Sequence, residues 1–102
     1  MKKIIEGKVY NTETANCLLE WSNGFMPNDF RYMYESIYLS KKGTYFLYYE
    51  GGAMSDYAEQ IGNNMSGSSN IKLITEEEAK KWALKHVSAE EYIDVFGEVE
   101  EG

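Results

Sequence analysis

The sequence predicts an α+β fold: a small antiparallel sheet with a central tyrosine-rich hairpin, packed against two or three short helices and ending in a helix pair. Three observations lead to this prediction. Aromatic and β-branched side chains crowd residues 30–49, which is typical of strands. Turn residues separate the short apolar runs before and after that segment. Helix-capping patterns followed by helical periodicity occur in the last third of the chain. Strands first and helices last is the order of an α+β fold.

The chain of 102 residues has the length of one domain, so we expect a single domain over residues 1–102 with an acidic tail over residues 97–102. Residues 3–10 read as a strand or a hairpin broken at Gly7. Residues 11–15 have room for one helical turn at most. The apolar run at residues 17–21 is expected to be a strand.

The strongest strand signal is a hairpin whose two arms are joined by Lys41-Lys42-Gly43, where glycine can take a positive φ. Large side chains occupy both faces of this hairpin. One face is therefore expected to pack on helices, and the other is either covered too or forms an exposed tyrosine surface. Beyond it we expect a short helix at residues 55–61, a loop at residues 62–70 and a short strand at residues 71–74.

Two capping boxes predict the C-terminal helices, with Thr75 and Ser88 as N-caps and a glutamate three residues after each. Gly97 is a natural residue to end the second helix. The apolar positions recur at helical spacing. The expected inward stripes are Ala79, Trp82, Ala83, His86 and Val87 in the first helix, and Ala89, Tyr92, Ile93 and Phe96 in the second.

Acidic residues are concentrated at the C-terminal end. Residues 90–101 carry six carboxylates and no basic side chain, which is −6 of a net charge of −7 and leaves the other 90 residues at −1. A one-sided anionic field favours a cationic partner and repels phosphate, so direct nucleic-acid binding is not expected. The six residues are Glu90, Glu91, Asp94, Glu98, Glu100 and Glu101.

Two interpretations of these acids stay open. Glu90 and Glu91 also fit a purely structural role, because the helix macrodipole favours anions in a first turn; the later acids would then solvate a tail. In the functional interpretation the acids face outward and occupy a basic groove of a partner protein. Tyrosines of the hairpin would add apolar contact area, and the candidates are Tyr32, Tyr34 and Tyr48. Their alternative role is packing in the sheet.

The sequence carries no catalytic motif, and we expect no enzymatic activity, no cofactor and no metal site. The lone cysteine, Cys17, excludes an internal disulfide and is expected to be a small buried residue. The lone histidine, His86, lies on an apolar stripe, where a structural role is expected. A small enzyme that uses Cys17 or His86 remains the third hypothesis.

The expected location is the cytoplasm. No apolar run approaches the roughly 20 residues of a membrane span. Glu6 follows the basic start so closely that no signal-peptide core is present.

Most of the chain resembles small acidic proteins carried by phages and integrative elements of Gram-positive bacteria. The stretches that carry the resemblance are Tyr10-Asn11-Thr12-Glu13-Thr14-Ala15, residues 29–62 with Phe30-Arg31-Tyr32, Tyr45-Phe46-Leu47-Tyr48 and Glu50-Gly51-Gly52-Ala53-Met54-Ser55, and residues 75–97. Such proteins often resemble anti-CRISPR inhibitors. The resemblance implies a non-enzymatic inhibitor that blocks a type II effector nuclease by mimicking nucleic acid. The alternative is a self-associating accessory or structural protein of the element, and a homodimer is then expected.

Overall fold

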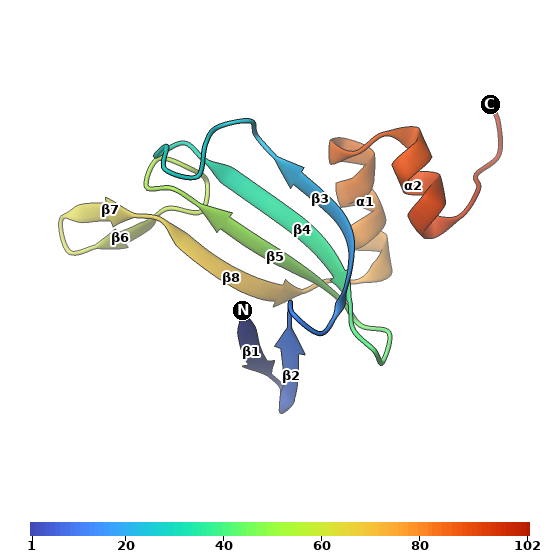
Figure 1. Ribbon diagram of the computed structural model, residues 1–102, viewed down its shortest axis with the longest axis horizontal. Coiled ribbons are helices and arrows are strands. Elements are labelled where there is room, and N and C mark those ends of the chain that lie inside the picture. The colour runs from blue at the N-terminus through green and yellow to red at the C-terminus, as the bar shows by residue number, and fades with distance from the viewer.

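The computed structural model describes all residues 1–102 and confirms the α+β class, with antiparallel sheets followed by a C-terminal helix pair (Figure 1). The elements in chain order are β1 (Lys2–Ile5), β2 (Lys8–Asn11), β3 (Asn16–Ser22), β4 (Met33–Leu39), β5 (Tyr45–Gly51), β6 (Glu59–Ile61), β7 (Asn64–Ser66), β8 (Ser68–Leu73), α1 (Glu76–His86) and α2 (Ala89–Phe96).

The central sheet has four antiparallel strands in the order β3-β4-β5-β8. The predicted tyrosine-rich hairpin is its middle pair, in which Ile37 lies opposite Leu47. Gly43 adopts φ +89° in the connecting turn, a conformation that glycine reaches without steric cost. The hairpin prediction from the alternating large residues and this turn is therefore confirmed.

One face of the sheet forms the main core against the helices. Leu19, Ile37 and Leu47 pack there against Ala79 and Ala83 of α1. Both alanines are completely buried, so their small side chains let the helix backbone approach the sheet closely. Burying each of the large aliphatic side chains stabilises the fold by about 1.5–3 kcal/mol.

Helix α1 begins with the predicted capping box. The Thr75 hydroxyl accepts a hydrogen bond from the Glu78 amide at 3.1 Å, and the Glu78 carboxylate accepts one from the Thr75 amide at 3.0 Å. Farther along the helix, the Trp82 indole donates to the carboxylate of Glu35 on β4 at 2.7 Å. Glu35 is 6% exposed, so this bond satisfies a carboxylate that would otherwise be costly to bury.

The opposite face of the sheet carries a second, smaller core, which the N-terminal hairpin β1–β2 covers in part. Tyr10, Phe46 and Ile71 are its buried members, and the rings of Tyr10 and Phe46 meet edge to face at 5.6 Å. The Lys3 ammonium ties the hairpin to β8 through the Asn70 side chain at 2.7 Å and the Ile71 carbonyl at 3.2 Å.

Residues 55–70 differ from the prediction. The expected helix at residues 55–61 is wrong: the segment forms a turn and then β6, which pairs with β7. The expected loop at residues 62–70 is wrong as well, because it contains β7 and the start of β8. Gly62 and Asn63 form a two-residue hairpin turn, with Gly62 at φ +61°, and such dipeptides favour a hairpin over a helix.

The molecule is elongated, with extents of 50 × 35 × 19 Å. The β6–β7 hairpin projects from one end of the long axis, α2 and the C-terminus lie at the other end, and β1–β2 projects from the side (Figure 1). Neither helix is long and apolar enough to cross a membrane.

Candidate functional site

The first candidate surface is the acidic arm, which we define as α2 together with the residues that follow it, 89–102. Ser88 starts the helix by accepting a hydrogen bond from the Glu91 amide at 3.2 Å. The Glu91 carboxylate accepts from the Ser88 hydroxyl at 3.2 Å rather than from its amide, so the reciprocal capping box predicted here is not formed. Gly97, at φ +93°, ends the helix as predicted.

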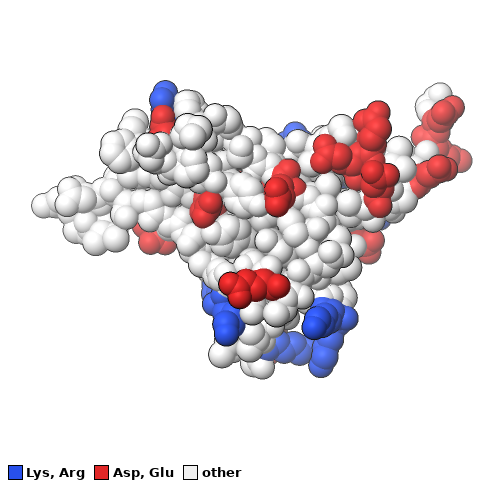
Figure 2. Space-filling view, viewed as in Figure 1, with Lys and Arg blue, Asp and Glu red and all other residues white.

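The six predicted acids of the arm are all exposed. None of them takes part in an ion pair; the two ion pairs of the molecule are Arg31–Asp29 and Lys80–Glu76. Figure 2 shows the consequence: acidic side chains gather over α2 and the C-terminal segment, with no basic side chain among them in this view. The arm therefore presents its negative charge to solvent without local compensation.

The arm is held to the main core by one side of α2. Tyr92, Val95 and Phe96 pack against that core, and the Phe96 ring lies 6.3 Å from the Tyr45 ring. No residue of α2 is fully buried. The predicted inward stripe is correct at Tyr92 and Phe96 but wrong at Ala89 and Ile93, which are exposed, and it omitted Val95, which packs against the main core.

The second candidate surface is the tyrosine face, defined by Tyr32, Tyr34 and Tyr48 on the side of the sheet away from the helices. Glu50 organises it: one carboxylate oxygen accepts from the Tyr32 hydroxyl at 3.0 Å, and the other accepts from the Tyr48 hydroxyl at 2.7 Å. The Tyr34 and Tyr48 rings lie 6.2 Å apart. The structure thus brings the three predicted tyrosines together, each of them half-buried.

The phenols of this face stay protonated far above neutral pH. Burial, followed by the hydrogen bond to Glu50, raises the pKa of Tyr32 to about 12. Burial is also the largest cause that raises the pKa of Tyr34 to about 12, and it raises the pKa of Tyr48 further. The hydroxyls of Tyr32 and Tyr48 already donate hydrogen bonds to Glu50. A partner protein would therefore contact mainly the aromatic rings of this face.

The acidic arm and the tyrosine face do not form one site. Strand β4 alternates its side chains, so Tyr34 points away from the face on which Glu35 meets Trp82 of α1. Since the arm packs on the helix side, the two surfaces lie on opposite faces of the sheet. The residues that we predicted as a single partner-binding set therefore form two sets.

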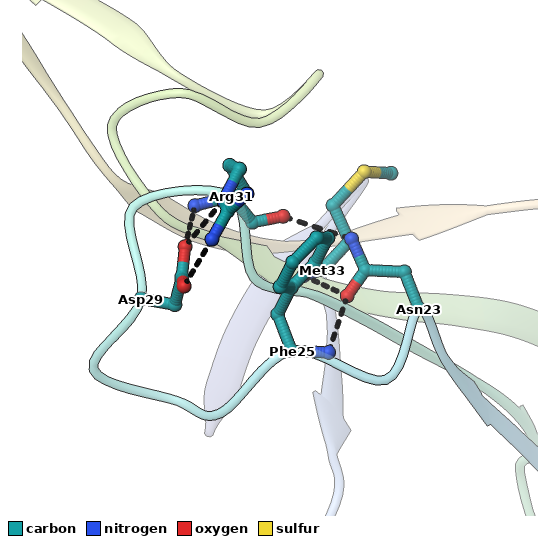
Figure 3. Close-up of polar contacts among 5 residues, drawn as sticks. All are labelled: Asn23, Phe25, Asp29, Arg31 and Met33. Carbon is teal, nitrogen blue, oxygen red and sulfur yellow. Dashed lines mark hydrogen bonds and ion pairs between the residues drawn. The ribbon is translucent and has the colours of Figure 1, made fainter.

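The loop between β3 and β4 is ordered by side-chain hydrogen bonds that the sequence did not predict (Figure 3). The Asn23 side chain spans it, donating to the Arg31 carbonyl at 2.8 Å and accepting from the Met33 amide at 3.1 Å. The Arg31 guanidinium binds both oxygens of Asp29, at 3.0 and 2.9 Å, and lies 4.2 Å from the centre of the Phe25 ring. The only arginine of the chain is thus used within the loop.

This ordered loop exposes apolar side chains next to the tyrosine face. Met26 is 69% exposed and Phe30 is 66% exposed. Phe25 lines a shallow groove together with Tyr32 and Tyr34. Asn23, Gly24 and Pro27 indicate a loop in the sequence. The hydrogen bonds that order the loop could not be predicted, because they join Asn23 to residues eight and ten positions away that only the folded chain brings close.

Cys17 and His86 lie apart. Cys17 is exposed on β3, which corrects the expectation of a buried residue, and it pairs with Tyr38 on the face away from the helices. Burial of the sulfur, followed by the Glu20 charge, raises the pKa of the thiol. The His86 ring lies 4.2 Å from the Trp21 ring at an interplanar angle of 36°, and burial lowers the pKa of the imidazole.

No group of three or more histidine, cysteine, aspartate or glutamate side chains is arranged to hold a metal ion. Comparisons of the chain with protein-family models, with curated proteins and with solved structures found no match.

Proposed function

We propose that this protein is a non-catalytic binding module whose acidic arm docks on the basic surface of a nucleic-acid-handling protein. The observation that carries the proposal is the state of the six arm carboxylates, which are all exposed and all without an ion-pair partner. Unpaired surface charge of one sign steers association with a surface of the opposite sign. Carboxylates on neighbouring helical turns are about 5–6 Å apart and can stand in for a line of phosphates.

The resemblance to proteins of phages and integrative elements gives this proposal its finer form. The partner is then a type II CRISPR effector nuclease, met in the cytoplasm of the bacterial host. The lysines and arginines of its channel ordinarily hold nucleic-acid backbones. The arm would occupy that channel and exclude nucleic acid, which makes the protein an inhibitor.

The test compares two variants that change net charge equally. In the arm variant all six acids are replaced by Gln or Asn, which takes the net charge from −7 to −1. The control variant neutralises six exposed acids outside the arm: Glu6, Glu13, Glu20, Asp56, Glu59 and Glu77. Capture from host lysate at low and at high salt identifies partners, and stopped-flow association with a purified partner gives the rates.

We expect the arm variant to lose capture and to associate at least about tenfold more slowly at low salt, whereas the control variant retains most of both. Far-UV circular dichroism confirms that both variants stay folded. Equal loss in the two variants would assign the effect to net charge and contradict a role for the arm. Unchanged binding by the arm variant would end the proposal.

A second candidate function is self-association of an accessory protein through the tyrosine face. The observation that favours it is the exposed apolar surface of the β3–β4 loop, where Phe25 lines a groove with Tyr32 and Tyr34 and where Met26 and Phe30 are also exposed. Light scattering over a range of protein concentrations separates the two candidates. A dimer that Phe30→Ser dissociates supports self-association, and a monomer at all concentrations supports a foreign partner.

A further inference from the structure

A cavity of about 290 Å³ lies between the N-terminal hairpin and the turn that joins β4 to β5. Strand β2 and the residues just after it form one wall, and residues 40–44 form the other. The β1–β2 hairpin, which supplies one wall, projects from the side of the molecule, whereas the acidic arm lies at one end of the long axis (Figure 1). Nothing in the function proposed above uses it.

Three lysines line this cavity: Lys8 from β2, and Lys41 and Lys42 from the turn. None of them takes part in an ion pair. Lys2 and Lys3 lie on the same hairpin, so residues 1–16 and 40–44 together hold five lysines against two glutamates, a side-chain charge of +3. Figure 2 shows basic side chains gathered on the side of the molecule from which β1–β2 projects. The residues outside the acidic segment 90–101 carry a net charge of only −1, but their lysines are concentrated in one region. We call this region, residues 1–16 and 40–44, the cationic pole.

Hydroxyl and amide groups between the lysines add neutral donors. The Ser40 oxygen accepts from the Thr44 amide at 3.0 Å, which leaves the Ser40 hydroxyl hydrogen free to donate. The Asn11 side-chain oxygen accepts from the Glu13 amide at 2.9 Å, which turns its NH₂ group to other partners. Thr14 also lines the cavity. These donors and three ammonium groups exceed what the two oxygens of a carboxylate can accept, and they suit the three oxygens of a phosphate monoester.

The floor of the cavity is apolar. Val9 and Ala15 expose surface there, whereas Tyr10 and Phe46, which also line the cavity, are buried members of the smaller core. An apolar floor with a few convergent polar groups is typical of sites for small organic ligands, and the volume is near the lower end of their range. The floor therefore favours an ester with an organic group over the bare ion.

Backbone hydrogen bonds hold both walls of the cavity in place. Backbone hydrogen bonds close the turn, from the Ser40 amide to Thr44 at 2.9 Å and from the Gly43 amide to Ser40 at 3.0 Å. On the other wall, the Asn11 carbonyl accepts from the amides of Thr14 and Ala15 at 3.2 and 3.0 Å. A preformed site loses little entropy on binding.

We propose that this cavity binds a small organic phosphate monoester, with Lys8, Lys41 and Lys42 on the phosphate and the organic group against Val9 and Ala15. A nucleic-acid chain fits less well, because binding along a backbone needs cations that follow many phosphates. The lysines of this pole are few, and the rest of the molecule is acidic. The site stands independently of the acidic arm.

The experiment is a titration of the full-length ¹⁵N-labelled protein at constant ionic strength with three probes: phenyl phosphate, inorganic phosphate and benzenesulfonate. We expect phenyl phosphate to cause saturable shifts in the amide signals of Asn11, Thr14 and residues 40–44. Inorganic phosphate lacks the ring, and benzenesulfonate lacks the second charge, so both should bind at least about tenfold more weakly. Equal affinity for inorganic phosphate would overturn the choice of an ester.

Two double variants of equal charge complete the test. Lys41→Gln with Lys42→Gln removes two cavity lysines, and we expect it to weaken phenyl phosphate binding by about tenfold or more for each lysine. Lys81→Gln with Lys85→Gln removes two exposed lysines of α1 and should leave the affinity within about twofold. Equal weakening in both pairs, or no saturable shift in the natural protein, would overturn the proposal. So would shifts at these residues that depend on protein concentration alone, because the occupant would then be the acidic arm of a second copy.

Discussion

The two C-terminal helices start alike in sequence but relate to the rest of the molecule in different ways. Helix α1 buries Ala79 and Ala83 in the main core and has basic residues in its last turn. Its Glu76 pairs with Lys80 at 3.6 Å. Helix α2 has no fully buried residue, no basic residue in its last turn and no ion pair.

The two helices therefore carry acids of two kinds: those of α1 stabilise the start of the helix, whereas those of the acidic arm are exposed to solvent and free to bind a partner. The acids of the first turn of α1 lie against a helix N-terminus, and one of them closes a capping box, so local structure accounts for them. The acids of the arm continue past the first turn of α2, where the helix macrodipole no longer stabilises negative charge. We expect substitutions in α1 to change stability and substitutions in the arm to change binding.

The largest difference in stability is expected from removing one polar group in each helix. Trp82→Phe deletes the donor to the buried Glu35 carboxylate and should lower the free energy of unfolding by about 1.5–3 kcal/mol. Tyr92→Phe deletes a hydroxyl that has no hydrogen-bond partner in the protein, and its effect should stay within about 0.5 kcal/mol. Urea denaturation followed by circular dichroism measures both. Similar losses in the two variants would contradict the distinction between the helices.

The N-caps give the next largest difference. Thr75→Ala breaks the capping box of α1 and should lower the free energy of global unfolding by about 1 kcal/mol. Ser88→Ala removes the same kind of bond from α2, which packs less deeply. We expect it to increase amide hydrogen exchange within α2 while global unfolding changes by less than about 0.5 kcal/mol. Loss of protection in α1 or in the sheet after Ser88→Ala would show that α2 unfolds together with the core.

The predictable parts of the fold are those whose signals are local. Thr75 and Glu78 are three residues apart and specify the start of α1 by themselves, and the turn at Lys41-Lys42-Gly43 specifies the central hairpin. The β6–β7 hairpin was missed because its polar strands resemble a loop, although the Gly62-Asn63 pair was a hairpin signal. The inward position of Val95 was missed because it depends on contacts between α2 and a main core whose residues are distant in sequence.

The candidate sites also differ in whether a local sequence signal predicts them. The acidic arm could be recognised from composition, because its six carboxylates lie within the twelve residues 90–101 and no basic residue lies among them. Whether lysines fold over them depends on tertiary structure. The shared Glu50 of the tyrosine face and the cavity between Lys8 and Lys41 bring together residues from separate elements, so a single sequence gives no local signal for either.

Acid should remove part of the stability of α1 through Glu78. Hydrogen bonds from the Thr75 amide and hydroxyl hold the pKa of this carboxyl below its ordinary value of 4.5. Because the pKa is lower in the folded protein, the contribution is fully present above about pH 4.5 and is lost as the pH falls through the folded value. Glu78→Gln should flatten the stability profile in that window, as measured by urea denaturation from pH 3 to pH 7. A profile of unchanged slope would exclude Glu78 as a source of the acid dependence.

The smallest effect on stability is expected from the acids that follow α2, which are exposed and make no ion pair. Changing Glu98, Glu100 and Glu101 to Gln leaves α2 intact, because these residues follow its Gly97 cap and make no ion pair. The free energy of unfolding should therefore move by less than about 0.5 kcal/mol. Association with a basic partner should nevertheless slow at low salt and approach the natural rate at high salt, where a Debye length of about 8 Å or less screens exposed charges. If the rates are unchanged at low salt, the residues after Gly97 contribute nothing to docking, and the proposed contact reduces to the three acids of α2.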